Sequence, residues 1–284
     1  MEGTGLYYVA IVGEGRRRRL MESHSVTLDV RRLVGRFSLR STSHVGRVSF
    51  LLLEMARAIP EWRIWIPRFF EQAQAVGYGS LFIVGLTAGF AGAVTSLQAG
   101  YQFTGSIPVY FAAGVIVESI ILELGPVLTA LILAGRIGAR YAAELGTMRV
   151  TEQIDALESL GRSSISHLVL PRVLAGTLML PVLVIFSDVV GIGAGWMAAK
   201  GSLGMTNADF IYGAQYFFRP WDLWYSMIKS FSFGLAITIV PCYVGFSTQQ
   251  GAEGVGRSTT AAVVSASVLI LFLDAALARA LLPR

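Results

Sequence analysis

Residues 123–161 read ELGPVLTALILAGRIGARYAAELGTMRVTEQIDALESLG, an apolar stretch that passes into a charged one. An apolar helix of about 20 residues can cross the roughly 30 Å hydrocarbon core of a bilayer. The rest of the chain has the same bias: of its 284 residues, 54% are hydrophobic and 14% charged, and the mean hydropathy is +0.61. Because a soluble domain carries about 25% charged residues, this composition excludes a disordered chain, a nucleic-acid-binding domain and an ordinary cytosolic enzyme. It predicts an all-α integral membrane protein.

Five apolar segments are long enough to span the membrane. Residues 72–117 contain no Asp, Glu, Lys, Arg or His, and the first span is expected at about 76–97. In the second span, Gly125-Pro126 is expected to bend or break the helix, because proline has no N–H and its ring clashes with the preceding turn. The other four spans are expected at about 112–142, between 172 and 200, at about 226–246, and between 257 and 279.

Ahead of the first span, residues 61–72 read EWRIWIPRFFEQ. Aromatic side chains at helical spacing, with Arg and Glu between them, are typical of a helix that lies in the membrane interface. Pro67 is expected to divide this helix into two pieces. An ordinary amphipathic packing helix would give the same pattern, and the sequence leaves both interpretations open.

The excess positive charge sits at one end of the chain. Residues 1–50 hold nine Arg and four acidic residues, whereas residues 51–284 hold 14 basic and 14 acidic residues. Residues 1–46 show no sustained hydrophobic period and are predicted to be a poorly ordered basic tail. Basic residues concentrate in this tail, in 143–171 and in 247–258, which predicts that the N-terminus and both connections are cytoplasmic. Five spans then put the C-terminus outside.

The residue pattern gives no support to catalytic or metal-binding chemistry. The single cysteine, Cys242, excludes a Cys-based metal cluster, and three scattered histidines indicate no zinc site. The glycine-rich GAEGVG at 251–256 lacks the lysine of a phosphate-binding loop and is interpreted as a turn. The chain is therefore predicted not to be an enzyme, with no catalytic residue, metal or cofactor of its own.

Ionisable residues at membrane depth are costly and are functional candidates. Glu118, Glu123, Arg136 and Arg140 lie in or near the second span. The two arginines are four residues apart and share a helix face, from which they would either line a lipid path or extend to lipid headgroups. Glu123 lies two residues before Gly125-Pro126, where it would bond freed backbone donors, gate an outward-facing cavity, or simply lie at the polar interface.

Further polar and small residues have two interpretations each. Asp188 would belong to a lipid path or make an interhelical hydrogen bond, whereas Asp274 would pair with Lys229 or with Arg257. Two GxxxG pairs favour packing within the chain over a dimer seam. These pairs are Gly85/Gly89 and Gly191/Gly195.

The second half of the opening stretch is predicted to form one helix over Thr147–Leu160 that ends at Gly161. An acidic amphipathic helix between two spans is placed to dock a soluble partner, although a solvated surface helix would look similar. Its apolar stripe is Val150, Ile154 and Leu157, and its acidic stripe is Glu152, Asp155 and Glu158.

The run ELGPVLTALILAGRIGA…AAELGTMRVTEQIDALESLG resembles the signature of the MlaE-type ABC transporter permeases, a family that includes the bacterial Mla and Mce permeases and the chloroplast lipid-import permeases. The likeness continues in the same order through PRVLAGTLMLPVL (171–183), MIKSFSFG (227–234) and GVGRSTTAAVVSASVLILFLD (254–274), and covers about residues 60–284. One departure is Leu122-Glu123, where many bacterial members have Arg-Glu before LGPV.

The resemblance implies the membrane-spanning permease of an ABC-type lipid transporter, with residues 47–284 as the permease domain and phospholipid as the expected cargo. It also implies a homodimer with lipid in an apolar cavity between the copies, a separate ATPase subunit that binds ATP and Mg²⁺, and an MCE-domain lipid-binding partner. The location implied is the bacterial inner membrane. The alternatives are an intramembrane lipid-modifying enzyme and a membrane scaffold without a transport role.

The residue pattern and the resemblance together give two sets of candidate site residues. The set expected to couple the chain to an ATPase is Arg149, Glu152, Asp155, Leu157 and Glu158. The set expected along the lipid path and its gate is Leu97, Glu118, Glu123, Pro126, Arg136, Arg140, Lys229, Arg257 and Asp274.

Overall fold

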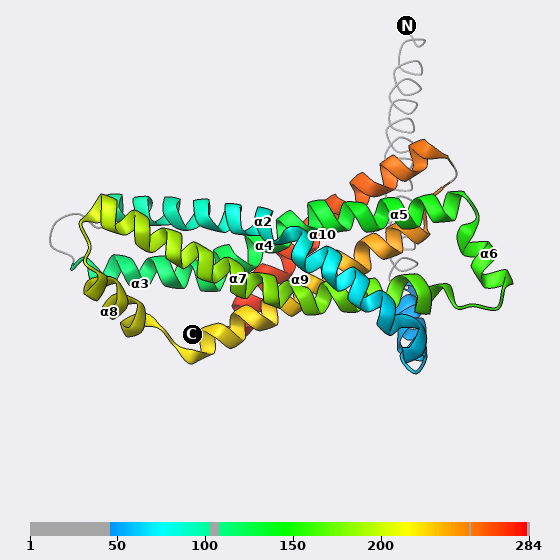
Figure 1. The fold of residues 1–284 in the computed structure, drawn as a ribbon, viewed down its shortest axis with the longest axis horizontal. Helices are drawn as coiled ribbons and strands as arrows, with labels where there is room; N and C mark the ends of the chain where they lie inside the picture. Colours follow the sequence, from blue (N-terminus) through cyan, green and yellow to red (C-terminus); the bar gives the residue numbers. More distant parts are fainter. Residues whose placement is uncertain (1–45, 103–107, 250, 283–284) are drawn as a thin grey trace, which may run out of the picture. The chain divides into compact units, whose positions relative to one another are not determined.

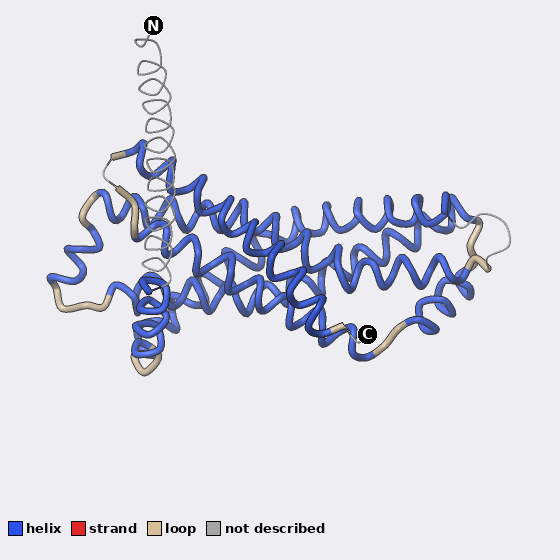
Figure 2. The backbone as a smooth tube through the Cα atoms, turned by 180° about the vertical axis from the view of Figure 1, so that it is seen from behind, coloured by secondary structure: helices blue, strands red, loops and turns tan. Residues whose placement is uncertain are grey.

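The computed structural model describes residues 46–102, 108–249 and 251–282. The chain divides into two units, Met1–Glu54 and Met55–Arg284. In the first unit residues 46–54 are helical, and the basic tail predicted at 1–46 lies outside the described residues except for its last residue. The second unit consists of helices joined by turns and loops, with no strand among its described residues (Figure 2).

Five long helices of the second unit are apolar and long enough to cross a membrane, which confirms the five-span prediction. The second and third contain π-helical turns (η), and a shorter helix, α8 (Asn207–Phe217), follows the third (Figure 1). The five are α2 (Trp62–Gln102); α3 (Tyr110–Ser119), η1 (Ile120–Leu124), α4 (Gly125–Leu133), η2 (Ala134–Gly138) and α5 (Ala139–Val150) in succession; η3 (Ile165–Val169) with α7 (Leu170–Leu203); α9 (Pro220–Phe246); and α10 (Ala252–Leu281).

The predicted break at Pro67 is wrong, because α2 runs without interruption from Trp62 to Gln102. Proline at this point removes one intrahelical hydrogen bond only five residues from the start of the helix. The carbonyl that loses its α-helical donor is that of Arg63, and the neighbouring Ile64 carbonyl accepts from the Arg68 guanidinium at 3.1 Å. Residues 62–71 therefore form no helix of their own, and their position in the membrane interface stays a prediction.

Helices α2 and α7 lie side by side and run in the same direction (Figures 1 and 2). At Gly92 of α2, an added Cβ atom would clash with the carbonyl oxygen of Gly191 of α7. Small residues let helix backbones approach this closely in lipid, where van der Waals packing rather than the hydrophobic effect holds helices together. The buried face of α2 recurs every three or four residues, at Val76, Ser80, Val84, Ala88, Gly92, Ser96 and Ala99.

Both GxxxG pairs pack within the chain, as the sequence favoured. Gly85 of α2 faces the ring of Phe186, and Gly89 faces Val190. On α7, Gly191 and Gly195 lie against backbone carbonyls of α2. These glycines therefore serve the α2–α7 contact, and their presence alone gives no reason to place a dimer seam there.

The Gly125-Pro126 pair does not break the second span, because a π-helical turn precedes it. In η1 the N–H of Gly125 donates to the carbonyl of Ile120, five residues back, and α4 continues at once. The wider turn accommodates the proline within a continuous helix. In an α-helix the N–H at position 126 would donate to the carbonyl of Leu122, and because proline has no N–H this carbonyl lacks its α-helical donor.

We expect Gly92→Ala to lower the free energy of unfolding by about 1–3 kcal/mol, because the new methyl group forces the α2 and α7 backbones apart. The measurement is thermal unfolding of the purified protein in detergent. Gly89→Ala is the matched control, since its Cβ would meet Val190 at an ordinary 3.9 Å. Equal melting temperatures for the two variants would contradict the close contact at Gly92.

Candidate functional site

Lys229 of α9 is a buried charge at the meeting point of three membrane-spanning helices, and its side chain is 0% exposed. Its Nζ atom donates to the carbonyl of Leu122 and to Glu123 Oε2, both at 2.8 Å. Asp274 of α10 forms a third contact, an ion pair of 2.5 Å between Oδ1 and Nζ that lacks hydrogen-bond geometry. We call Lys229, Glu123 and Asp274 the ion cluster; it joins η1, α9 and α10.

The ion cluster supplies a hydrogen-bond donor to a backbone carbonyl that proline leaves without one. The Leu122 carbonyl is the group that Pro126 leaves without its α-helical donor, and the Lys229 ammonium takes the place of that donor. The Tyr225 ring lies 5.0 Å from Nζ, within range of a cation–π contact. Three oxygen atoms and an aromatic ring therefore surround the ammonium. With both carboxylates ionised, the cluster carries a formal charge of −1.

Two other polar expectations for the membrane spans are settled by these contacts. Asp274 pairs with Lys229, whereas Arg257 bonds Glu253 one turn earlier on α10 at 2.9 Å and is exposed. Asp188 lies against Gly125, where a Cβ atom would clash with its Oδ1 atom. Within the described residues that oxygen has no hydrogen-bond partner, so it does not make the expected interhelical hydrogen bond.

A groove of about 440 Å³ lies beside the ion cluster, between α2 and η1. We call it the Glu123 groove; its lining includes Val94, Thr95 and Gln98 from α2, and Ser119, Glu123 and Leu124 from the second span. The Glu123 side chain is 47% exposed, so its carboxylate contacts both the buried Lys229 and the groove. The volume falls in the range of about 300–1,000 Å³ that small-molecule sites occupy.

Leu97 does not line this groove, although it was expected on the lipid path. It lies on α2 with 54% of its surface exposed, next to Gln98, which does line the groove. Glu118, also expected on the path, is half-buried and interacts electrostatically with Arg219 and Asp222 at the start of α9. The structure therefore brings Glu123, Lys229 and Asp274 together and leaves Leu97 and Glu118 outside their contacts.

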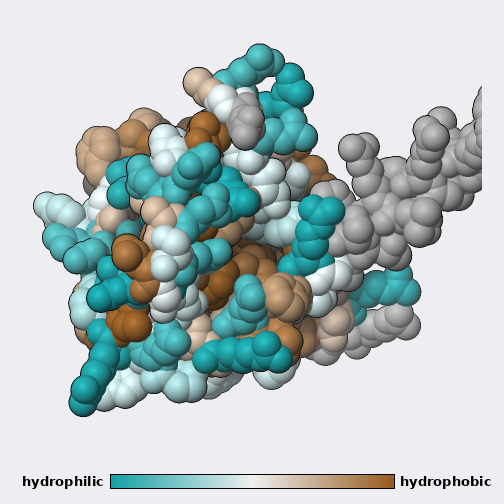
Figure 3. Space-filling view, turned by 90° about the vertical axis from the view of Figure 1, so that its right-hand side faces the viewer, coloured by the Kyte–Doolittle hydropathy of each residue, from teal (hydrophilic) through white to brown (hydrophobic). Residues whose placement is uncertain are grey.

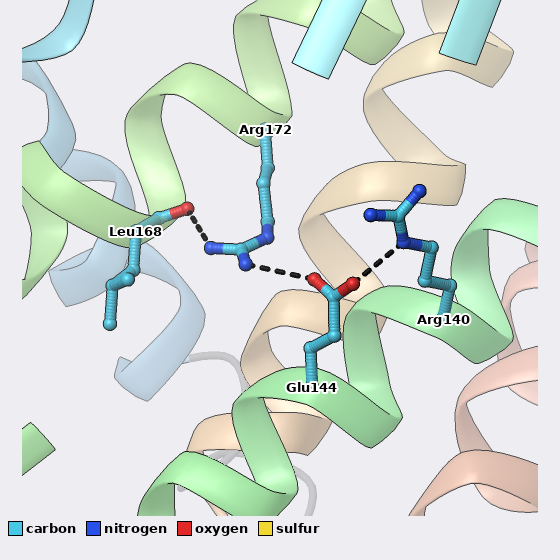
Figure 4. Close-up of polar contacts among 4 residues, drawn as sticks. All are labelled: Arg140, Glu144, Leu168 and Arg172. Carbon is cyan, nitrogen blue, oxygen red and sulfur yellow. Dashed lines mark hydrogen bonds and ion pairs between the residues drawn. The ribbon is translucent and has the colours of Figure 1, made fainter. Parts of the chain in front are cut away.

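A second polar network ties α5 to α7 (Figure 4). Glu144 accepts from Arg140 Nε at 2.6 Å and from Arg172 Nη2 at 2.9 Å, and Arg172 also donates to the carbonyl of Leu168 at 2.8 Å. The Arg172 side chain is 7% exposed and lies over the Tyr141 ring. Arg140 thus takes part in a polar bridge between two spans, and its expected place on a lipid path or at lipid headgroups stays a prediction.

Arg136 is separate from this network. It lies in η2, is exposed, and its Nη2 atom would be 3.4 Å from a Cβ atom placed on Gly79 of α2. The π-helical turn rotates the residues that follow it relative to an α-helix. The two arginines, predicted to share one face, therefore have different surroundings, and the role of Arg136 stays a prediction.

The predicted single helix over Thr147–Leu160 is wrong; the segment is a helix–turn–helix. Helix α5 ends at Val150, Glu152 adopts a left-handed conformation with φ of 58°, and α6 (Gln153–Ser159) follows. The Thr151 hydroxyl and N–H both return to the carbonyl of Thr147, which closes the last turn of α5. The chain can therefore change direction between α5 and α6. The helical spacing of the apolar residues did not predict this turn.

Four of the five coupling candidates are exposed, and three of them are already paired. Arg149 and Asp155 form an ion pair of 2.5 Å across the turn, and Glu158 accepts from the Ser164 hydroxyl at 2.7 Å. Leu157 is half-buried, and Ile154 is buried and anchors α6. Figure 3 views the end of the bundle that carries α6, where hydrophilic residues gather around smaller apolar patches. Glu152 is exposed.

Glu144 and Arg172 are the polar residues that sequence reasoning missed. The only local signal was the four-residue spacing of Arg140 and Glu144, which places opposite charges on one helix face. Arg172 lies 28 residues from Glu144 in sequence, and no spacing rule connects them. Among the described residues, no group of three or more His, Cys, Asp or Glu side chains is placed to hold a metal ion.

Comparison with known proteins gives one consistent answer. Residues 69–280 match the family described as Permease MlaE. The chain is 40% identical over 256 residues to a probable ABC transporter permease protein of Synechocystis, covering 88% of this chain and 90% of that one. It is 37% identical over 244 residues to a probable ABC transporter permease protein of Rickettsia bellii, covering 86% and 94% respectively.

A plant relative carries a lipid in its name. The chain is 38% identical over 204 residues to the chloroplastic protein Trigalactosyldiacylglycerol 1 of Arabidopsis thaliana, which covers 72% of this chain and 58% of the plant protein.

We expect Lys229→Met to lower the free energy of unfolding by about 3–5 kcal/mol, because it leaves Glu123, Asp274 and the Leu122 carbonyl without their shared cation. The measurement is the melting temperature in detergent. The matched control is Lys200→Met, which removes the other lysine of the chain, an exposed one near Trp196. The ion cluster would lose its structural importance if both variants melted with the wild type.

Proposed function

Because the chain belongs to the MlaE permease family, an ABC transporter permease family, we propose that it is the membrane-spanning subunit of a lipid transporter. The Glu123 groove carries this proposal. It lies in a membrane-spanning bundle, and its lining combines apolar side chains with hydroxyl, amide and carboxylate groups. A lipid has the same two parts, acyl chains and a polar headgroup. The lipid in the name of the Arabidopsis relative supports the same cargo class.

A separate ATPase subunit would supply the energy and would bind the ATP and Mg²⁺. The support is the α5–α6 segment, which combines a buried anchor, Ile154, with exposed Glu152 and the 76% exposed apolar side chain of Leu160. An exposed apolar residue beside a charge is what a docking surface offers a partner. We assign to this segment the transmission of force from the ATPase to α5.

The remaining assignments concern partners and place. Large apolar side chains face outward on α2 and α10, among them Phe82 at 81% and Phe272 at 69% exposure. Lipid and a second copy of the chain would both cover such surfaces, and we assign a homodimer with phospholipid between the copies. An extracytoplasmic MCE-domain protein would exchange lipid with it across the bacterial inner membrane. If no ATPase co-purifies with the chain, the alternatives are an intramembrane lipid-modifying enzyme and a membrane scaffold without a transport role.

We expect Glu152→Lys to reduce recovery of the ATPase in a pull-down from the native membrane at least tenfold, because losing an interface charge pair costs about 2–5 kcal/mol. Lipid transport should fall with it. Glu and Lys at position 152 are both unbranched side chains on a left-handed backbone, which disfavours them similarly. The comparison of Glu152→Lys with the wild type therefore reports the change of charge. Glu71→Lys, on the exposed start of α2, is the control. Undiminished recovery with Glu152→Lys would show that the segment is only a solvated surface feature.

The orientation is tested by cysteine labelling from either side of the membrane. In a Cys242→Ala background, we expect Ser159→Cys, in α6, to react with an impermeant maleimide only from the cytoplasmic side. Ser202→Cys, near the end of α7, should react only from outside. Both serines are exposed, so access does not limit labelling. The reverse pattern would overturn the cytoplasmic placement of α6 and with it the ATPase assignment.

A further inference from the structure

The Glu123 groove has an electrostatic character that follows from the ion cluster. Among its described lining residues there is no Lys or Arg, and its one charged side chain is the carboxylate of Glu123. Lys229 stands directly behind that carboxylate but is 0% exposed and enclosed by three oxygen atoms and the Tyr225 ring. A ligand in the groove therefore meets the negative side of the cluster and cannot reach its cation.

The two oxygen atoms of Glu123 have different surroundings. Oε2 accepts from Lys229 at 2.8 Å. Among the described residues, Glu123 Oε1 has no hydrogen-bond partner, and 47% of the side chain is exposed. Because Asp274 also binds Lys229, the single positive charge is shared between two carboxylates. The groove thus faces a carboxylate that is only partly neutralised.

The uncharged groups of the groove favour the same kind of ligand. The Thr95 hydroxyl donates its hydrogen to the carbonyl of Ala91 at 2.7 Å. Toward a ligand in the groove, this hydroxyl can therefore act only as a hydrogen-bond acceptor. Gln98 is exposed and offers an amide that both donates and accepts. The Ser119 hydroxyl can both donate and accept, so the negative carboxylate of Glu123 is what gives the polar side of the groove its acceptor character, while Val94 and Leu124 supply apolar surface beside it.

From this geometry we infer that the Glu123 groove selects lipids whose headgroups carry hydrogen-bond donors, hydroxyl or ammonium, over lipids whose headgroup ends in a bare phosphate. A donor-bearing headgroup satisfies Glu123, Thr95 and Gln98 at once. A terminal phosphate would lie beside the Glu123 carboxylate without a cation to offset the repulsion, and like-charge juxtaposition at a contact is strongly unfavourable. This inference rests on the proposed lipid function and narrows its cargo.

The test compares three lipids with identical acyl chains: phosphatidylethanolamine, monogalactosyldiacylglycerol and phosphatidic acid. The full-length protein in detergent is titrated with each, and bound lipid is counted by native mass spectrometry. We expect the ethanolamine lipid and the galactolipid to bind at least tenfold more tightly than phosphatidic acid. Equal affinities, or tightest binding of phosphatidic acid, would overturn the headgroup inference and leave the lipid function standing. Absence of saturable binding for all three would instead remove the proposed function itself.

Two variants separate the two donor chemistries. Glu123→Gln removes the charge but keeps an acceptor, so binding of phosphatidylethanolamine should fall about tenfold while the galactolipid changes less than threefold. Gln98→Leu, which does not touch the ion cluster, should weaken both. Glu71→Gln, an exposed carboxamide change on α2 outside the groove, is the matched control and should change neither. Melting temperatures of all variants establish that they are folded. Unchanged ethanolamine preference in Glu123→Gln would show that the carboxylate does not read the headgroup.

Discussion

A backbone group in hydrocarbon needs a partner within the protein, because no water is present to supply one. Pro126 violates this requirement in the middle of the second span, where it leaves the Leu122 carbonyl without its α-helical donor. The buried ammonium of Lys229 supplies the missing donor at 2.8 Å. A buried cation needs counter-charges in turn, and Glu123 and Asp274 provide them. One proline thus accounts for the meeting of three helices at a single charged point.

The position of the groove follows from the same arrangement. Its second wall is α2, which is held against α7 by contacts such as Gly92 on Gly191, where the two backbones touch. The absence of side chains at these two glycines lets α2 and α7 approach this closely. The Glu123 carboxylate then faces a space of about 440 Å³. Ion pairing on one side and glycine packing on the other therefore define the surface that a ligand would meet.

At the end of the bundle that carries α6, the Glu144 network connects two spans and the turn at Glu152 separates two helices. Glu144 binds Arg140 on its own helix and Arg172 on α7, so these contacts tie α5 to the third span. The left-handed Glu152 separates α5 from α6, and the ion pair between Arg149 and Asp155 bridges the separation. If an ATPase docks on α6 as proposed, the turn at Glu152 and the contacts of Glu144 form the covalent and polar connection from α6 through α5 to α7.

Length and hydropathy are local properties, and they were enough to predict five spans. Residue spacing predicted the packing glycines, and the ionisable character of Glu123, Lys229 and Asp274, together with the family resemblance, made them candidates. Sequence alone did not determine how these residues pair, because Lys229 and Glu123 are 106 residues apart and only helix packing brings them together. Periodicity also missed the turn at Glu152, and the usual effect of proline wrongly predicted a break at Pro67, since the course of the backbone at both points depends on the surrounding structure. The chain's composition decides that it lies in a membrane; tertiary structure decides which charges are buried, which are paired, and which remain exposed to a ligand.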